Sequence, residues 1–134
     1  MDENLRILVV DDMPAVRMIV RGMLEEIGFR QIFEAESAES AWSQLTVAAS
    51  QKSQKFGLVI SDWMMQGMSG IDLLRLVRNS PELRDLPFLI ITSQGEQDRM
   101  AEATQAGATD FVVKPFDGSQ LSEKVEQALA PHDS

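Results

Sequence analysis

This chain lacks cysteine, long apolar runs and an excess of positive charge. No cysteine occurs among its 134 residues, which excludes disulfides and thiolate metal sites and permits a reducing compartment. The 12 lysines and arginines are outnumbered by 21 aspartates and glutamates, and the net charge of -9 opposes binding to nucleic acid or to anionic membranes. No apolar run approaches the ~18 residues of a membrane span, and the acidic start lacks the positive charge of a signal peptide. We therefore expect a cytoplasmic protein whose partners are proteins and cations.

Length and composition predict a single domain over residues 1–134. With 44% hydrophobic residues the chain can bury its own core, and no second, output domain fits. Apolar runs predict strands at 5–10, 31–34, 58–62, 86–91 and 111–113. Helical spacing predicts helices at 14–27, from the cap Ser37 to 48 or 49, around 71–77, at 95–106, and from the capping box Asp117/Gln120 to 129. It places Ile19 on the apolar side of the first helix, and the few apolar residues of 95–106 predict weak packing there. This alternation predicts an α/β fold with a parallel sheet covered by helices on both faces.

Polar residues that can take part in chemistry or bind a metal ion follow the predicted strands. Asp11 and Asp12 come after the first strand, Asp62 ends the third, Thr92 ends the fourth and Lys114 follows the fifth. Because the carboxyl ends of parallel strands share one edge of the sheet, we expect these side chains to converge. Three carboxylates alone repel one another and raise one another's pKa values, and a hard cation such as Mg²⁺ resolves that conflict.

An acidic cluster with Mg²⁺ is suited to accepting a phosphoryl group. Asp62 can attack a phosphoryl donor and form an acyl phosphate. Lys114 is then placed to neutralise phosphoryl charge, and the Thr92 hydroxyl to donate to a phosphoryl oxygen. Each residue alone also has a structural explanation, such as a helix cap, a turn residue, a strand end or a solvated charge. Only their joint placement favours the chemical interpretation.

Four short segments carry a resemblance to a known family. Val9-Val10-Asp11-Asp12, Ser61-Asp62-Trp63, Ile91-Thr92-Ser93 and Val113-Lys114-Pro115-Phe116 resemble the receiver domain of two-component response regulators, and especially its single-domain chemotaxis members. The resemblance covers nearly the whole chain. It implies a flavodoxin-like, doubly wound sheet of five parallel strands in the order 2-1-3-4-5, with five helices on both faces.

The resemblance also implies a role for each site residue. Asp62 is the phosphoacceptor, and the phosphohistidine of a sensor histidine kinase is the donor. Mg²⁺ is held by Asp12, Asp62 and the backbone carbonyl of Met64, with Asp11 acting mainly through water. Lys114 pairs with the phosphate and leads into a cis peptide at Pro115. The protein is then a signalling phosphoacceptor, and not an enzyme beyond its own phosphorylation and dephosphorylation.

A switch and a set of tuning positions follow from the same resemblance. Thr92 moves toward the phosphoryl group and Phe111 moves inward, which alters the surface of the fourth helix, fifth strand and fifth helix. Met64 and Gln94 tune hydrolysis, and the small Ser93 gives access to the donor. A separate protein, such as the flagellar switch, reads the altered surface in chemotaxis or motility signalling.

The chain departs from the family pattern at several positions. Gln66 stands where proline is usual, so we expect a less rigid loop after Asp62. Phe111 replaces the tyrosine of the chemotaxis members, which removes a hydroxyl that a partner can bind. We hypothesise that the apolar Met64 hinders the attacking water and lengthens the phosphorylated lifetime. We expect Trp63 to be half exposed beside the site.

Four other functions remain open at this point. The protein can serve as a phosphorelay shuttle or as a scaffold that needs no phosphorylation. A flavin-binding flavodoxin shares the fold, but the acidic Asp11-Asp12-Met13-Pro14 loop is unsuited to cradling phosphate. An aspartyl-nucleophile phosphatase shares the chemistry, but no Asp-x-Asp pair follows the first strand.

Overall fold

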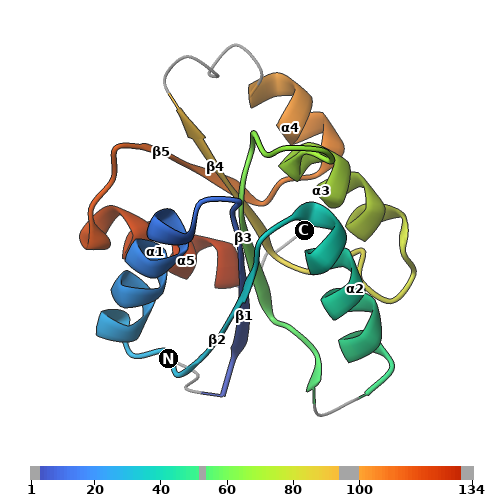
Figure 1. Ribbon diagram of the computed structural model, residues 1–134, viewed down its shortest axis with the longest axis horizontal. Coiled ribbons are helices and arrows are strands. Elements are labelled where there is room, and N and C mark those ends of the chain that lie inside the picture. Colours follow the sequence, from blue (N-terminus) through green and yellow to red (C-terminus); the bar gives the residue numbers. More distant parts are fainter. Residues whose placement is uncertain (1–3, 52–53, 94–99, 131–134) are drawn as a thin grey trace.

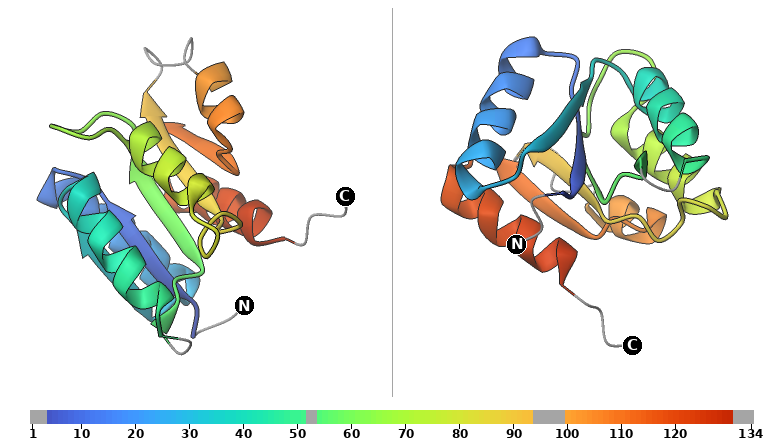
Figure 2. Two further views of the ribbon diagram at one scale, coloured as in Figure 1. Left: turned by 90° about the vertical axis from the view of Figure 1, so that its right-hand side faces the viewer. Right: turned by 90° about the horizontal axis from the view of Figure 1, so that it is seen from below.

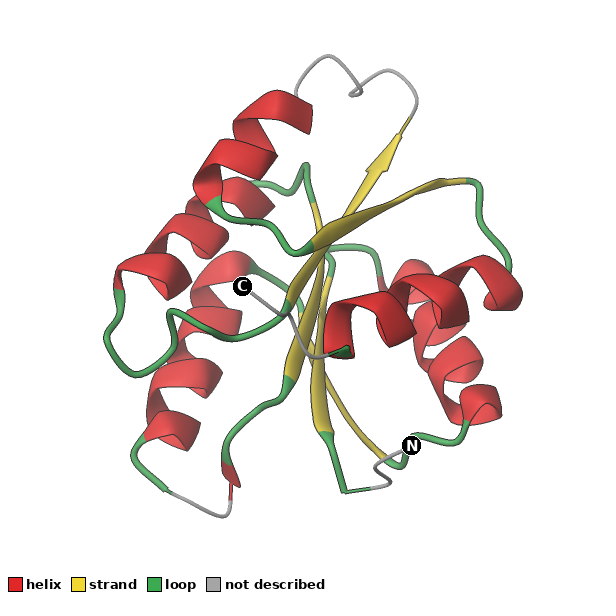
Figure 3. Cartoon of the chain, turned by 180° about the vertical axis from the view of Figure 1, so that it is seen from behind, coloured by secondary structure: helices red, strands yellow, loops and turns green. Residues whose placement is uncertain are grey.

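Strands and helices alternate along the whole of the described chain. The computed structural model describes residues 4–51, 54–93 and 100–130. The elements are β1 (Arg6–Val10), α1 (Pro14–Ile27), β2 (Gln31–Ala35), α2 (Ala38–Ala49), β3 (Leu58–Asp62), α3 (Gly70–Asn79), β4 (Phe88–Ser93), α4 (Met100–Ala106), β5 (Asp110–Lys114) and α5 (Gly118–Leu129). Figure 1 shows these elements from one side and Figure 3 from behind.

The strands form one parallel sheet in the order β2-β1-β3-β4-β5, which confirms the predicted flavodoxin-like fold. The chain moves outward from β1 to β2 and then returns past β1 to β3. Strand order therefore reverses between β1 and β3, and ligands of open α/β sheets bind outside the carboxyl ends of the strands at such a point. Val10 pairs with Ser61, so the residues that follow them, Asp11 and Asp62, lie at the same level along the two neighbouring strands.

Helices cover both faces of the sheet, α1 and α5 on one and α2, α3 and α4 on the other (Figure 2). Alternate residues of β1 face opposite sides: Ile7 and Val9 join the apolar cluster under α1 and α5, and Leu8 and Val10 join the other cluster. Every residue of the central strand β3 is buried. Burial on both faces explains why these strands read as continuous apolar runs.

Local signals begin and end the helices as the sequence predicts. Pro14 lies in the first turn of α1, and Gly28 ends it with φ 122°, a conformation that favours glycine. The Ser37 side chain accepts a hydrogen bond from the Ser40 N–H at 3.0 Å. Asp117 and Gln120 form the predicted capping box of α5. In α4 only Ala103 is buried, in keeping with its predicted weak packing, and the start of the predicted helix at 95–99 lies outside the described residues.

Two predictions about exposure are wrong. Trp63 is 2% exposed rather than half exposed, because its ring joins the cluster under α2, α3 and α4. The backbone N–H of Trp63 donates to the Ile91 carbonyl oxygen at 3.0 Å, which extends the pairing with β4 one residue past the end of β3. Ile19, which helical spacing places on the buried side of α1, is 56% exposed.

Within the part of the chain that the structure describes, no helix has both the length and the apolar character needed to cross a membrane.

Candidate functional site

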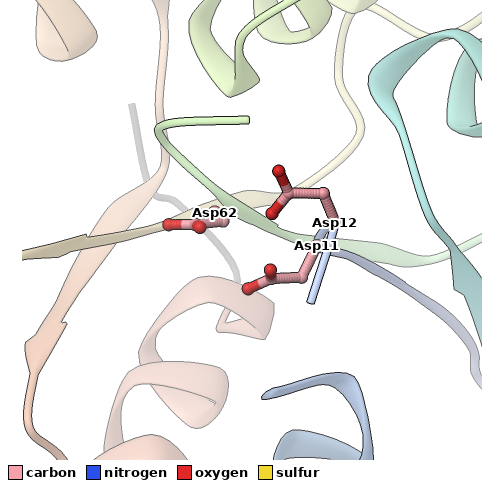
Figure 4. Close-up of side chains that lie close together, drawn as sticks. All are labelled: Asp11, Asp12 and Asp62. Atoms are coloured by element: carbon pink, nitrogen blue, oxygen red, sulfur yellow. The ribbon is translucent and has the colours of Figure 1, made fainter. Parts of the chain in front are cut away.

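Three carboxylates meet at the carboxyl edge of the sheet (Figure 4). Asp11 and Asp12 follow β1, and Asp62 is the last residue of the neighbouring strand β3. One oxygen from each side chain lies within 4.8 Å of the others. The predicted convergence of these residues is therefore confirmed, and it follows directly from the pairing of β1 with β3.

Asp11 is the most buried of the three carboxylates, with 1% of its surface exposed. Its Oδ1 accepts a hydrogen bond from the Met13 N–H at 2.9 Å, whereas the buried Oδ2 has no hydrogen-bond partner among the described residues. Burial raises the pKa of Asp11, opposed by the Met13 N–H and the charge of Lys114, while Asp12 raises it further. An unpartnered buried carboxylate oxygen that faces other carboxylates is the arrangement that a bound cation satisfies.

Asp12 is exposed, and the loop after β3 reaches it. The backbone N–H of Gln66 donates to Asp12 Oδ2 at 3.3 Å. A proline at this position has no N–H and cannot make this hydrogen bond. The departure at Gln66 therefore adds a contact between the loop and the acidic cluster.

Lys114 brings positive charge to the same edge. Its Nζ lies 3.6 Å from Asp62 Oδ1, and the Asp62 side chain is 11% exposed. The Lys114-Pro115 peptide bond is cis, as expected. Gly70 allows the chain after Asp62 to turn closely into α3, because a Cβ there would clash with the Asp62 carbonyl oxygen.

The expected switch residues lie on the two strands beyond Asp62. Thr92 is fully buried, and its hydroxyl donates to the Ser93 carbonyl oxygen at 3.3 Å. Phe111 on β5 is partly buried against the core and lines a cavity of about 310 Å³, together with Met100, Phe116 and Lys124. The cavity opens on the face formed by α4, β5 and α5.

The tuning positions are described only in part. Met64 is 54% exposed, two residues after Asp62, and Ser93 is partly buried at the end of β4. Gln94 lies outside the described residues.

Sequence reasoning missed one contact of the acidic loop. Arg17 on α1 donates through Nη1 to the backbone carbonyl oxygen of Asp11 at 2.6 Å. The only signal in the sequence is its position on the polar side of the predicted first helix, which many solvated arginines share. Nothing local in the sequence indicates that its side chain turns back to the loop.

These donors fit a hard divalent cation. The cluster offers carboxylate oxygens alone, which are the ligands that Mg²⁺ prefers, and the unpartnered Asp11 Oδ2 provides an acceptor that the described residues leave unused. Fold and site together define a flavodoxin-like α/β domain with an acidic cation site at its switch point. Similar proteins narrow this class further.

A family model described as the response regulator receiver domain matches residues 7–126. The chain belongs to this family, as its resemblance at the sequence level indicates. It is 39% identical over 127 residues to the chemotaxis protein CheY-3 of Vibrio cholerae, covering 95% of this chain and 93% of that protein. It is 40% identical to the chemotaxis protein CheY of Pseudomonas aeruginosa, covering 92% and 94%.

Solved structures agree with this assignment. The chemotaxis response regulator CheY4 of Vibrio cholerae superimposes with a TM-score of 0.82 at 26% identity, covering 93% of this chain and 98% of that one. The receiver domain of NtrX from Brucella abortus gives a TM-score of 0.78 at 31% identity, covering 92% and 97%. The protein is thus a receiver domain of the CheY type, a signalling phosphoacceptor with an acidic pocket of Asp11, Asp12 and Asp62. A receiver domain implies a histidine kinase as its partner.

Proposed function

We propose that Asp62 is the phosphoacceptor, that its modification by a histidine kinase requires Mg²⁺, and that the altered α4-β5-α5 surface binds a second protein in chemotaxis or motility signalling. The observation that carries this proposal is the surroundings of Asp62. Its carboxylate lies at the switch point of the sheet, 3.6 Å from Lys114 Nζ and within 4.8 Å of oxygens of Asp11 and Asp12. The chemotaxis role rests on the relatives of about 40% identity.

The chemistry is a transfer from phosphohistidine to carboxylate. A carboxylate oxygen of Asp62 forms the new P–O bond while the P–N bond of the donor breaks, and the imidazole leaves. Lys114 lies where it pairs with the added phosphoryl charge. Asp12, Asp62 and the Met64 carbonyl would hold Mg²⁺, with Asp11 acting mainly through water, and the ion supplies positive charge for the phosphoryl oxygens when bound.

Thr92 and Phe111 are placed to carry the change to the surface. The hydrogen bond from the Thr92 hydroxyl to Ser93 is long at 3.3 Å, so it costs little to exchange for a phosphoryl oxygen. Phe111 borders the cavity of about 310 Å³ on the α4-β5-α5 face, so an inward movement of its ring would change the shape of that surface. Ser93, at the end of β4, leaves space for the donor because its side chain is small.

The test is the intact mass of the protein after incubation with acetyl phosphate and Mg²⁺. We expect one phosphoryl adduct on the wild type, and none on Asp62→Asn or on wild type with a metal chelator. An adduct that persists in Asp62→Asn would contradict the assignment of the phosphoacceptor. No adduct on the wild type would favour a scaffold that acts without phosphorylation. Rapid, reversible transfer of the phosphoryl group from Asp62 to a histidine of a second protein would favour a phosphorelay shuttle.

A further inference from the structure

Arg17 connects the acidic loop to the edge of the sheet. Its side chain is only 14% exposed and uses two separate donors. Nη1 donates to the Asp11 carbonyl oxygen at 2.6 Å, and Nε donates to Glu34 Oε1 at 3.1 Å. One planar guanidinium therefore spans the loop after β1 and the strand β2.

Glu34 orients this guanidinium from the other side. It lies on β2 in register with Val9 of β1, and its second oxygen accepts from Arg21 Nη1 at 2.9 Å. The position of the carboxylate is thus fixed by two arginines from successive turns of α1. Arg21 shares this carboxylate with Arg17, and its guanidinium contacts Glu34 rather than the acidic loop.

The backbone on both sides of Asp11 is held toward β2. The Asp11 N–H donates to the Ala35 carbonyl oxygen at 3.1 Å, and the Asp11 carbonyl oxygen accepts from Arg17. These two hydrogen bonds fix the peptide groups before and after Asp11, and so the directions in which the Asp11 and Asp12 side chains point. We propose that Arg17, oriented by Glu34, is a positioning residue that holds the Asp11-Asp12 loop in the conformation that binds the cation. This inference rests on the proposed function, because it concerns the metal site used there.

The direction in which Mg²⁺ affinity changes when Arg17 is removed distinguishes a positioning role from a purely electrostatic one. A guanidinium near a cation site repels the cation, so its removal would tighten Mg²⁺ binding if charge alone mattered. Loss of a positioning contact weakens binding, and outer-shell partners of metal ligands are worth roughly 10- to 100-fold in affinity. Arg17→Gln and Arg21→Gln remove the same charge and each breaks a bond to Glu34, but only Arg17→Gln releases Asp11.

The experiment is a Mg²⁺ titration of the metal-free protein, followed by amide NMR shifts in wild type, Arg17→Gln, Arg17→Lys and Arg21→Gln. We expect Arg17→Gln to raise the dissociation constant about tenfold and Arg21→Gln to leave it within about twofold. Arg17→Lys keeps the charge but loses the planar fork, so it should fall between them. An affinity of Arg17→Gln equal to or tighter than that of Arg21→Gln would overturn the inference.

Amide hydrogen exchange gives a second readout that needs no metal. The Met13 N–H, which donates to Asp11 Oδ1, should exchange faster in Arg17→Gln than in Arg21→Gln. Equal exchange in the two variants would show that Arg17 does not hold the loop. If the wild type fails to bind Mg²⁺, the metal requirement of the proposed function fails, and the exchange rates still decide the role of Arg17. If Arg17→Gln does not fold, Arg17→Lys replaces it in both comparisons.

Discussion

The body and the carboxyl end of each central strand serve opposite purposes. In β3, Leu58, Val59 and Ile60 are fully buried apolar residues, whereas the same strand ends on Asp62. The end of β1 likewise passes from apolar residues to the buried carboxylate of Asp11. Burial of apolar surface stabilises the fold at about 25 cal/mol per Å². Burial of a carboxylate whose Oδ2 has no partner among the described residues costs stability. The apolar body of the strands offsets that cost at their carboxyl ends.

The largest expected contrast is between Ile60→Ala and Asp62→Asn, two residues apart on β3. Ile60→Ala leaves a cavity and should lower the free energy of unfolding by about 2–5 kcal/mol, while the folded fraction still forms the phosphoryl adduct. Asp62→Asn should abolish the adduct without lowering the free energy of unfolding. Urea denaturation and intact mass measure the two effects. A loss of stability in Asp62→Asn as large as in Ile60→Ala would break the contrast.

Asp11→Asn should stabilise the metal-free protein at neutral pH. Burial raises the pKa of Asp11 above its ordinary 3.8, so the folded state binds its proton more tightly than the unfolded state. The stability that this group contributes is therefore complete below pH 3.8 and is lost as pH rises through the raised pKa. Asparagine cannot ionise, and we expect a gain of about 1 kcal/mol at pH 7.

The check is urea denaturation of both proteins with a chelator across the pH range. The difference in the free energy of unfolding between wild type and Asp11→Asn should increase as pH rises above 3.8. Saturating Mg²⁺ should narrow it, because the cation stabilises the wild-type carboxylate. A difference that is constant with pH would mean that ionisation of Asp11 is not its cause.

Met64→Asn should shorten the lifetime of the phosphorylated protein. Met64 is 54% exposed beside the site, and a shorter amide in its place would admit and orient the attacking water. A barrier lowered by about 1 kcal/mol corresponds to roughly fivefold faster loss of the adduct, followed by mass spectrometry over time. Met18→Asn is the matched control, since Met18 is 71% exposed on α1. Equal lifetimes in wild type and Met64→Asn would reject the hypothesis.

The smallest effect is expected at Gln66. Gln66→Pro removes the N–H that donates to Asp12, whereas Gln66→Ala keeps it. A long, exposed hydrogen bond contributes about 0.5 kcal/mol, so we expect Gln66→Pro to weaken Mg²⁺ binding about twofold and Gln66→Ala to leave it unchanged. Titrations by amide NMR shifts measure both. Identical affinities would show that the hydrogen bond does not position Asp12.

Most of the fold can be predicted from the sequence because its signals are local. Strand and helix periods, the caps Ser37 and Asp117, and the apolar character of β3 depend on neighbouring residues. Exposure is less predictable where a residue leaves an element, as at Trp63, whose side chain packs in a core cluster with residues of α2 and α3. Ile19 shows the same limit on a helix, since spacing alone does not say how far a neighbouring helix reaches around α1.

By itself, the sequence determined the order of the elements and the set of polar residues at the strand ends. Parallel strands align their carboxyl ends, so Asp11, Asp12, Asp62 and Lys114 were expected at one edge of the sheet. Their contact also required the strand order, in which β1 pairs with β3. The tertiary structure alone decided which outside groups hold the carboxylates, because those contacts join distant positions. Gln66 and Asp12 are 54 residues apart, and Arg17 and Glu34 are 17 apart. Such contacts depend on how α1 and the loop after β3 pack on the finished sheet, which no local pattern encodes.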